Sequence, residues 1–587
     1  MSRHGRHLAA LRAVALLAWL GLLAGCAVAP AQRALVDALV EEHSGLELHG
    51  GESTWPLQRL PNPEGSGHRL VLVDRGDDAL ALRLHLIRTA TTSIEIQNYI
   101  FLLDDSGQLL LRELLAAAAR GVRVRVLVDS LFSLPDEELQ AALELAHPNF
   151  DLRVYRPVLE QSVLRDGEFI GAILCCFHEL NQRMHNKLMV ADGQHALVGG
   201  RNHSARYFDL DPRMVFTDLE ILVSGRVVES MRAGFDAFWG HPLALPPRHT
   251  RRVHRRLQSE LPERVNLEVS DRLRRLDAQF ADGEWLHRLM QERTYRVAAV
   301  GYFSDLPEDR GDNIDPPAAD STAQIHALIG AARREVVIQT PYSVLSNRFR
   351  DVLMELDEAV DVVISSNSLA STDAFPVYAV SRKQRAFLLE DLGVRFFEAM
   401  PYPADLETLV PRYPELVAER AAGIETPMRG DPAPATRDVP GPRLSLHAKV
   451  VVVDQRYVIV TSHNLDPRSE LYNTENGIVV DDAAFATAVL DVIAVMTAPG
   501  NSWVSALRPG PGGLIGGIQR FGARWSRRAP TFDLWPGYRF EQYRQSLGQS
   551  EDTEPEAVGL APDVVAAQRR VVTAMVSRMM GFLRPIL

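Results

Sequence analysis

The sequence predicts an α/β fold in which two similar domains follow one another and are related by a pseudo-twofold axis. Three observations support this prediction. Segments typical of strands alternate with helical segments, this order occurs twice, and one short polar motif recurs at identical spacing in both copies. A chain of 587 residues is also too long for a single hydrophobic core. We therefore expect two tandem α/β domains with mixed, largely parallel sheets flanked by helices.

The first copy of the strand–helix–strand unit begins with TTSIEIQNYIF (91–101), which is rich in β-branched and aromatic residues and alternates in polarity. The helical stretch SGQLLLRELLAAAARG (106–121) follows, and its final glycine is a residue typical of helix C-termini. VRVRVLVDS (122–130) predicts the next strand.

The second copy repeats this order with RREVVIQTPY (333–342), RFRDVLMELDEAV (348–360) and DVVISSNS (361–368). Strands that alternate with helices favour parallel sheets covered on both sides. We read the repetition as an internal duplication.

Stretches rich in proline, glycine and acidic residues separate these units and predict loops or linkers, at 307–320, 423–443 and 551–562. We accordingly divide the chain into five segments: a leader (1–26), a first domain (27–245), a helical and charged linker (246–315), a second domain (316–500) and a C-terminal extension (501–587). The basic run RHTRRVHRR (248–256) is expected to form a solvated helix face between the halves, with attraction of phosphate as the alternative.

The first 26 residues have the layout of a bacterial secretory signal, with a cationic start, a short apolar core and LAGC at the end. This end resembles a lipobox, which implies lipidation of Cys26. An uncleaved anchor is the alternative, but the apolar run is shorter than the ~20 residues that a spanning helix needs. We expect a lipoprotein of the bacterial cell envelope that faces the periplasm, with Ala27 favouring the outer membrane.

The two other cysteines, Cys175 and Cys176, are adjacent in the sequence. Adjacent cysteines seldom satisfy disulfide geometry, and two are too few for a structural zinc site. We expect them to be packed apolar residues.

The formal net charge of −12 argues against broad nucleic-acid binding, because such binding requires a cationic surface that neutralises phosphates. A local cationic site remains compatible with this balance. At the other end of the chain, residues 563–587 place valines, Met579 and Leu583 on one helical face and arginines on the opposite face. This pattern fits either an interfacial helix or a helix docked on the core.

Lysine is almost absent from the chain, and two of its three lysines belong to the recurring motif. MHNKLMVADGQHALVGGRN (184–202) reappears as LHAKVVVVDQRYVIVTSHN (446–464), with His, Lys, Asp and Asn at the same relative positions. Residues two apart on a strand face the same way, so each histidine should project together with its lysine. The chain then turns at the aspartate and returns to bring the asparagine to the same end. The motif residues are His185, Lys187, Asp192 and Asn202, and then His447, Lys449, Asp454 and Asn464.

An imidazole, an ammonium and an amide in one patch suit a phosphodiester, because attack on phosphorus moves negative charge onto oxygens that cations and N–H donors stabilise. Lysine offers a compact charge where the planar fork of arginine would be wide. Asn202, Asn464 and Ser462 are candidate phosphate ligands; the first copy has Gly200 at the position of Ser462. The two motif aspartates stand where a turn needs them, and we expect them to be structural.

Each histidine also needs a group that fixes its tautomer, which is usually an acid on the second ring nitrogen. Asp218 in FTDLEILVSG and Glu475 in LYNTENGIVV are our candidates for these orienting carboxylates. The alternative is that they are ordinary acids at strand ends.

The repeated H-x-K-x-x-x-x-D pattern, with GGRN and SHNLDPRS following, resembles the phospholipase D superfamily. More narrowly, LNQRMHNK, SSNSLASTDAFPVYA and LYNTENGIVV resemble bacterial cardiolipin synthases of the C type, and the likeness covers roughly residues 80–500. The stretch 167–183 and residues 505–563 depart from this pattern.

The resemblance implies a two-step exchange without metal or cofactor. One histidine forms a phosphohistidine, while the other protonates the leaving alcohol and deprotonates the incoming one. By the family pattern His185 is the nucleophile and His447 the acid/base, although pseudo-symmetry leaves the order open. In the resting enzyme we expect one imidazole to be neutral and the other protonated.

The leading hypothesis is cardiolipin synthesis from phosphatidylglycerol and a second phospholipid, by a protein that acts as a monomer at a membrane and binds no nucleic acid. Hydrolysis to phosphatidic acid shares the same intermediate and is the first alternative. A nuclease and a non-catalytic lipoprotein that binds lipid or a partner are lesser alternatives.

Overall fold

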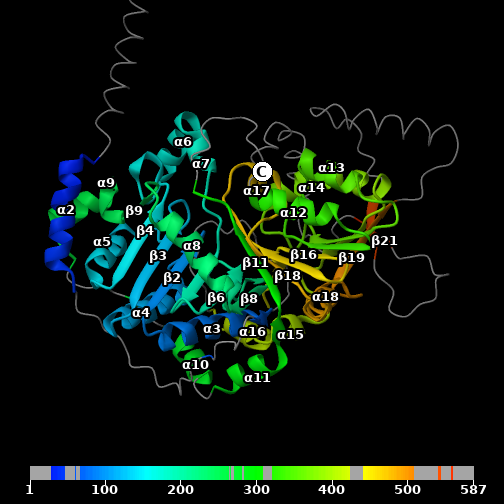
Figure 1. Cartoon of the computed structure of the whole chain (residues 1–587), viewed down its shortest axis with the longest axis horizontal. Helices are drawn as coiled ribbons and strands as arrows, with labels where there is room; N and C mark the ends of the chain where they lie inside the picture. The colour runs from blue at the N-terminus through cyan, green and yellow to red at the C-terminus, as the bar shows by residue number, and fades with distance from the viewer. Residues whose placement is uncertain are drawn as a thin grey trace, which may run out of the picture.

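The computed structural model describes residues 28–45, 60, 67–262, 265, 267, 270–280, 283–307, 320–423, 441–507, 540–543 and 557–559. Within these residues each half of the chain forms one mixed sheet with helices packed around it (Figure 1). The leader, Cys26 and the C-terminal helix pattern lie outside the described residues, so those expectations stay predictions.

The strands of the first sheet lie in the order β10 (Thr294–Val297), β1 (His68–Val73), β8 (Glu220–Ser224), β6 (His195–Gly199), β5 (Leu188–Ala191), β2 (Ser93–Asn98), β3 (Arg123–Asp129), β4 (Phe150–Tyr155) and β9 (Ala244–Leu245). Those of the second sheet are β11 (Ala299–Ser304), β18 (Asn476–Asp481), β17 (Tyr457–Thr461), β16 (Val450–Val453), β12 (Glu335–Gln339), β13 (Asp361–Asn367), β14 (Arg395–Ala399), β19 (Ser502–Leu507), β20 (Phe540–Tyr543) and β21 (Ala557–Gly559). A separate pair joins β7 (Met214–Thr217) to β15 (Arg443–Leu446).

The described helices of the first half and of the segment after it are α2 (Pro30–His43), α3 (Gly76–Thr89), α4 (Asp105–Ala119), α5 (Glu137–Ala146), α6 (Asp166–Cys175), α7 (Phe177–Asn181), α8 (Val227–Trp239), α9 (Arg251–Ser259), α10 (Asp271–Gln279) and α11 (Glu284–Glu292). Those of the second half are α12 (Asp320–Gly330), α13 (Asn347–Met354), α14 (Phe375–Glu390), α15 (Leu406–Leu409), α16 (Tyr413–Ala421), α17 (Pro467–Leu471) and α18 (Ala483–Thr497). Short 3-10 turns occur at Val158–Glu160, Ala205–Tyr207 and Pro247–His249.

The predicted duplication is confirmed in the strand–helix–strand units. β2, α4 and β3 in the first half correspond to β12, α13 and β13 in the second. Parallel pairing is confined to β2–β3–β4 and β12–β13–β14 in these sheets. The sheets are mixed as expected, but they contain less parallel pairing than the strand–helix alternation suggested. The reason is that each motif forms a hairpin, β5–β6 or β16–β17, whose next strand in the sheet, β8 or β18, also pairs antiparallel.

The segment 246–315 contains an edge strand of each sheet as well as helices. β10 pairs with β1 in the first sheet, and β11 pairs with β18 in the second, so the chain crosses between the sheets at Ala298. A single hydrophobic core is shared across this boundary and includes Val198 and Phe235 from the first half with Ile478 and Phe485 from the second. Extensive apolar contact of this kind holds two domains in one arrangement.

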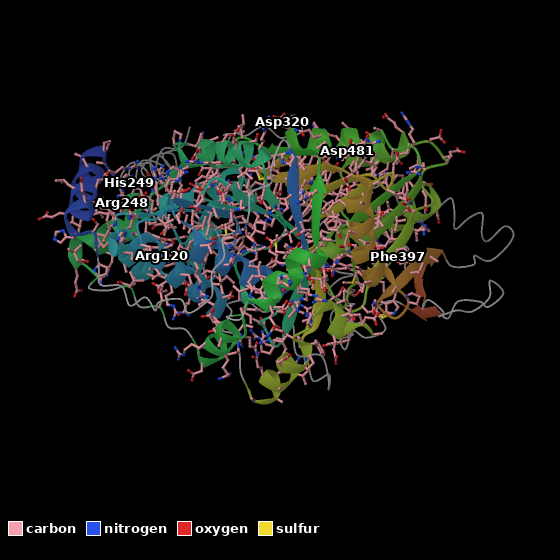
Figure 2. All side chains as sticks on the ribbon, turned by 60° about the horizontal axis from the view of Figure 1, so that its bottom comes forward. Arg120, Arg248, His249, Asp320, Phe397 and Asp481 are labelled. Carbon is pink, nitrogen blue, oxygen red and sulfur yellow. A yellow bond between two sulfur atoms is a disulfide. The ribbon has the colours of Figure 1, made fainter. Side chains whose placement is uncertain are left out.

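The basic run 248–256 does not lie between the halves, and three of its five arginines, Arg248, Arg252 and Arg256, pair with carboxylates. Arg248 pairs with Asp37 and Glu144, and Arg256 pairs with Glu138. Figure 2 places Arg248 and His249 beside α2, at the end of the first half away from the second. Our expectation of a position between the halves was wrong. Arg255 is exposed to solvent as expected, while carboxylates of α2, α5 and α6 pair with Arg248, Arg252 and Arg256, which leaves less free charge for the alternative, a phosphate site.

Cys175 and Cys176 form a disulfide with each other, contrary to our expectation. Helix α6 ends between them, and Cys176 leaves helical geometry with φ −138° and ψ 40°. Cys175 is exposed rather than packed.

None of the helices in the described part of the chain, α6 included, has the length and apolar composition needed to cross a bilayer.

Candidate active site

The two motif segments are held by the backbone of the opposite half of the molecule. β7 of the first half pairs in parallel with β15 of the second, and the N–H of His447 donates to the carbonyl of Thr217 at 2.8 Å. The N–H of His185 donates in the same way to the carbonyl of Thr474 at 2.9 Å. Both motif histidines therefore lie at the boundary between the domains. Their position depends on backbone pairing between the two halves, which the sequence of either motif alone does not reveal.

His185 takes its carboxylate partner from the second half. Its Nδ1 lies 2.8 Å from Oε2 and 3.1 Å from Oε1 of Glu475. Glu475 also accepts a hydrogen bond from Asn473 at 3.2 Å, and its backbone N–H donates to Asp305 at 2.8 Å. The carboxylate is thus fixed from several sides, which leaves Nε2 as the ring nitrogen available for chemistry.

His447 takes its carboxylate partner from the first half, because its Nδ1 lies 2.6 Å from Oδ2 of Asp218. Gly200 makes room for that carboxylate: a Cβ at this position would lie 2.3 Å from Oδ1 of Asp218. The hydroxyl of Tyr207 lies 3.3 Å from the other ring nitrogen, Nε2, and Nζ of Lys449 lies 3.0 Å from Nδ1 and 3.2 Å from Nε2. Both predicted orienting carboxylates therefore touch a motif histidine, each across the domain boundary.

Each lysine lies against the histidine of its own motif. Nζ of Lys187 donates to the carbonyl of His185 at 2.8 Å, and Nζ of Lys449 donates to the carbonyl of His447 at 2.7 Å. Strands β5 and β16 begin only after these lysines, so the pairs lie in extended segments that lead into the strands we expected to carry them. Histidine and lysine nevertheless project together in both motifs.

Burial governs the protonation of this cluster. Desolvation lowers the pKa of Lys187 to about 7 and that of Lys449 to about 8, although Glu475 and Asp218 counteract it. Desolvation is also the main cause that lowers the pKa of both motif histidines to about 4. The charge of Lys449 contributes to the lowering at His185 from across the domain boundary, so the two motifs are within electrostatic reach of each other.

The two orienting carboxylates remain anionic despite their burial. Burial alone would raise the pKa of Asp218 and of Glu475, but the partner histidine and the nearby lysines bring both below their ordinary values. Both imidazoles are therefore neutral near pH 7 in the free protein. This differs from our expectation of one protonated histidine, because desolvation lowers the pKa of both rings and the neighbouring lysines add to the lowering.

Aromatic side chains that the sequence interpretation missed surround both rings. Tyr99 packs edge-on against His185 with ring centroids 4.8 Å apart, and Tyr207 packs edge-on against His447 at 4.9 Å. Phe216 lies 5.2 Å from His447. Tyr99 lies near the C-terminal end of the predicted strand 91–101, the end where parallel units place functional groups, and this was the signal that could have identified it.

The two motif asparagines are used differently. Oδ1 of Asn202 accepts from the backbone N–H of Ile100 at 3.2 Å, and its Nδ2 donates to the hydroxyl of Tyr207 at 2.9 Å. Oδ1 of Asn464, by contrast, has no hydrogen-bond partner within the described structure. Asn202 thus supports Tyr207, while the unpartnered Oδ1 of Asn464 is an acceptor that can take a hydrogen bond only from a donor.

The hydroxyl of Ser462 already makes hydrogen bonds with other groups of the protein. Its hydroxyl donates to Oε2 of Glu475 at 2.5 Å and accepts from the backbone N–H of Asn476 at 3.0 Å. Its one proton is already used, contrary to our expectation that Ser462 contacts the phosphate. Ser462 helps to fix Glu475, whereas the glycine at the equivalent position, Gly200, makes space for the shorter Asp218.

Two further asparagines, neither of them predicted, clamp the motif backbone. Asn476 accepts from the N–H of Lys187 at 2.9 Å and donates to its carbonyl at 3.2 Å. Asn367 accepts from the N–H of Leu446 at 2.8 Å and donates to its carbonyl at 2.7 Å. Each amide imitates a neighbouring strand: Asn476 fixes the motif lysine Lys187 itself, and Asn367 fixes the residue before His447.

The motif aspartates lie at the far ends of β5 and β16, away from the histidines. Asp192 accepts from the backbone N–H groups of Thr91, Thr92 and Ser93, and Asp454 accepts from those of residues 333–335. Both have φ near +55° (53° and 55°). These contacts tie each hairpin turn to the start of β2 or β12.

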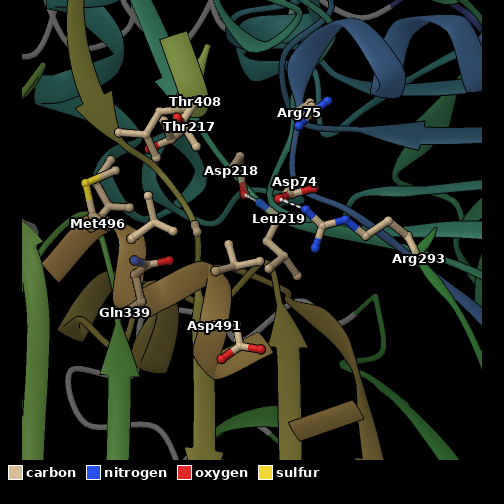
Figure 3. A pocket seen from close by; sticks show the side chains of 15 residues that line it. Asp74, Arg75, Thr217, Asp218, Leu219, Arg293, Gln339, Thr408, Asp491 and Met496 are labelled. Carbon is tan, nitrogen blue, oxygen red and sulfur yellow. Dashed lines mark hydrogen bonds and ion pairs between the residues drawn. The ribbon is translucent and has the colours of Figure 1, made fainter. Parts of the chain in front are cut away.

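A cavity of about 190 Å³ lies behind the motif strand rather than at the histidines (Figure 3). Leu446 and Ala448 line it, and they alternate along the chain with His447 and Lys449, which face the other way. Apolar side chains of α18 and the ion pair between Asp74 and Arg293 complete its wall. This cavity is therefore separate from the histidine cluster, although Asp218 borders both.

The cluster as a whole can bind and stabilise a tetrahedral anion. The two ammonium groups can balance negative charge on non-bridging oxygens, and the two oriented imidazoles present ring nitrogens for attack or proton transfer. Within the described residues, no group of three or more His, Cys, Asp or Glu side chains is arranged to hold a metal ion.

Comparison with known proteins identifies similar chains. The family model described as "Cardiolipin synthase, PLD-like domain" matches residues 84–239 and 325–496. Cardiolipin synthase C of Escherichia coli K12 is 30% identical over 436 residues, covering 71% of this chain and 82% of that protein. An uncharacterized protein of Helicobacter pylori J99 is 28% identical over 438 residues, covering 73% of this chain and 78% of that protein. A crystal structure of phosphatidylserine synthase from Haemophilus influenzae Rd KW20 aligns with TM-score 0.49 and 15% identity, over 78% of this chain and 93% of that chain.

Proposed function

The chain belongs to the phospholipase D superfamily, in the group of cardiolipin-synthase-like proteins with PLD-like domains, and from this membership we propose that it transfers phosphatidyl groups between phospholipids. The specific reaction that we propose is synthesis of cardiolipin from phosphatidylglycerol and a second phospholipid. The observation that carries the proposal is the crossed pairing of His185 with Glu475 and of His447 with Asp218.

In the first step Nε2 of His185 attacks the phosphorus of the donor lipid. A P–N bond forms, the P–O bond to the headgroup alcohol breaks, and His447 supplies a proton to the departing oxygen. Lys187 and Lys449 balance the charge that grows on the non-bridging oxygens. Because both histidines are neutral in the free protein, the anionic phosphate must raise the pKa of His447 as it binds, which its charge favours.

In the second step His447 removes a proton from the hydroxyl of the acceptor lipid, whose oxygen then attacks phosphorus. The P–N bond breaks, and His185 returns to its neutral form. The assignment of roles follows the family pattern and one asymmetry of the site: the hydroxyl of Tyr207 lies 3.3 Å from Nε2 of His447, whereas Nε2 of His185 makes no hydrogen bond within the described residues. We assign the amide nitrogen Nδ2 of Asn464 to a phosphate oxygen, to which it would donate.

Hydrolysis uses the same intermediate with water as acceptor, so the products separate the two reactions. Purified full-length protein would be incubated with mixed-lipid vesicles, with each lipid omitted in turn, and the products would be identified by mass. We expect cardiolipin and the headgroup alcohol from the parent protein and no product from His185→Ala. His43→Ala, an exposed histidine at the end of α2, is the matched control and should match the parent. Phosphatidic acid without cardiolipin would establish hydrolysis instead.

We also propose that lipidation of Cys26 holds the protein in the cell envelope, facing the periplasm at the outer membrane. Several acyl chains on one residue would give stable attachment, where one chain binds reversibly. Labelled palmitate should enter the parent protein in cells and should not enter Cys26→Ser, and membrane fractionation should recover the parent with the outer membrane. Equal labelling of both proteins would refute the anchor.

A further inference from the structure

Five large hydrophobic side chains are exposed near the motif of the first half, and we name them the apolar rim: Phe132, Phe169, Ile170, Ile173 and Leu174. Their exposed fractions run from 38% for Phe169 to 83% for Leu174. Four of them belong to α6, where Ala172 alone is buried. The segment FIGAILCCF (169–177) carries no charged residue.

Helix α6 is fixed on the protein by its opposite side. Ala172 belongs to a small core with Val158 and Leu180, and Leu131 packs against that core. With one face held in this way, Ile170, Ile173 and Leu174 follow helical spacing on the outward face. The exposure is thus built into the packing of the helix.

Phe132 connects the apolar rim to the candidate active site, and its neighbour Leu131 packs against the small core that holds α6. Phe132 packs edge-on against Tyr99 with ring centroids 5.7 Å apart, and Tyr99 packs edge-on against His185 at 4.8 Å. Helix α7 follows α6 directly, and the chain then reaches His185 four residues after α7 ends at Asn181. An unbroken path of aromatic rings therefore leads from exposed apolar surface to the imidazole.

We propose that the apolar rim enters the surface of a phospholipid bilayer and so places His185 at the level of the lipid phosphates. The inference rests on the proposed function, since the phosphodiester and the acyl chains of one lipid would then meet the histidine and the rim, respectively. A helix of ten residues is roughly 15 Å long, too short to span a bilayer and suited to lying in its interface. The other exposed large hydrophobics within the described residues, Leu35, Leu306 and Met354, each stand alone on different segments.

Vesicle flotation tests this inference without requiring turnover. The full chain would carry Cys26→Ser, so that no acyl anchor contributes, and the vesicles would contain phosphatidylglycerol and phosphatidylcholine. Ile170→Ser combined with Leu174→Ser should lower the vesicle partition coefficient by about tenfold or more, because two apolar side chains no longer leave water. Leu35→Ser combined with Met354→Ser removes comparable exposed apolar surface elsewhere and should partition as the parent does.

Turnover of two substrates then separates this inference from the proposed function. The rim variant should process monomeric short-chain phosphatidylglycerol at the parent rate and vesicular phosphatidylglycerol at about one tenth of it or less. A rim variant that floats like its parent, or that loses turnover of the monomeric substrate as well, would overturn the inference. If the parent turns over neither substrate, the proposed function fails while flotation still decides on the rim. Thermal unfolding verifies folding, and the two single variants replace the double variant should it unfold.

Discussion

Nδ1 of His185 lies 2.8 Å from Oε2 of Glu475, a residue 290 positions further along the chain. The reciprocal pair, His447 and Asp218, spans 229 positions in the opposite sense. Each half of the molecule thus contributes one histidine and the carboxylate that orients the other half's histidine. Neither half alone contains a complete imidazole–carboxylate pair, so the chemistry depends on the docking of the two domains.

Glu475→Gln should lower turnover by about 10²–10⁴-fold, because an amide can stabilise the wrong tautomer of His185 and cannot stabilise its charged form. Asp218→Asn should do the same through His447. Initial rates of lipid product formation measure the effect, and thermal unfolding should remain close to that of the parent. Full activity in either variant would show that these carboxylates are ordinary strand-end acids.

Gly200→Ala should also reduce turnover, by displacing the Asp218 carboxylate that a Cβ would approach to 2.3 Å. The matched control is Gly301→Ala, where a Cβ would meet nothing within 4 Å. We expect the control to retain parent rates. Equal rates in the two variants would contradict the role of Gly200 in making space for the carboxylate.

The lysines predict an alkaline loss of activity. Lys187 must be protonated to balance phosphate charge, and its pKa is lowered to about 7, with that of Lys449 at about 8. The value of kcat/KM should therefore fall as pH rises through the range 7–8. In Lys187→Arg the residual activity should lose the lower of these two inflections, because arginine stays charged. An unchanged profile in that variant would assign the alkaline inflection elsewhere.

The buried histidines predict an acid-side loss of stability. The pKa of both His185 and His447 falls from 6.5 in the unfolded chain to about 4 in the folded protein. Between pH 4 and 6.5 the unfolded state binds more protons than the folded state. The stability that the two neutral histidines contribute is therefore fully present above pH 6.5 and is lost as the pH falls toward 4. Replacing both with glutamine should flatten the decline in urea midpoint between pH 6.5 and 4.5, relative to the parent. A decline of the same steepness in the variant would argue against neutral buried imidazoles.

Asp192→Ala should destabilise the fold by about 1–3 kcal/mol, because three backbone N–H groups at the start of β2 lose their acceptor. Turnover per folded molecule should stay near the parent value at temperatures where the variant is folded. Urea unfolding and active-fraction measurements test the two parts. A loss of turnover without loss of stability would make Asp192 part of the chemistry.

The duplicated motif was enough to predict the two α/β halves, the motif hairpins and the pairing of each histidine with its lysine. These features depend on local strand geometry and on spacing, which a sequence displays directly. The crossed carboxylate pairing could not be derived, because β7–β15 and the bridge between Met184 and Thr474 arise only when the domains meet.

Other differences have similarly non-local causes. The carboxylate partners of Arg248 and Arg256 lie on α2 and α5, far away in the sequence. The sequence therefore did not indicate that these charges are paired. The position of Ser462 in the motif suggested a phosphate ligand, but its hydroxyl donates its hydrogen bond to Glu475. The disulfide of Cys175 and Cys176 depends on where α6 ends, a detail that apolar sequence around it did not reveal.

The covalent adduct is the most direct measurement. The parent protein would be mixed with phosphatidylglycerol labelled in its phosphate, quenched in base to preserve phosphohistidine, digested and mapped by mass spectrometry. We expect the label on the peptide that contains His185, and none in His185→Ala. Product formation with label on His447, or with no label on either motif histidine, would contradict the assignment of His185 as the nucleophile at a site that the two halves share.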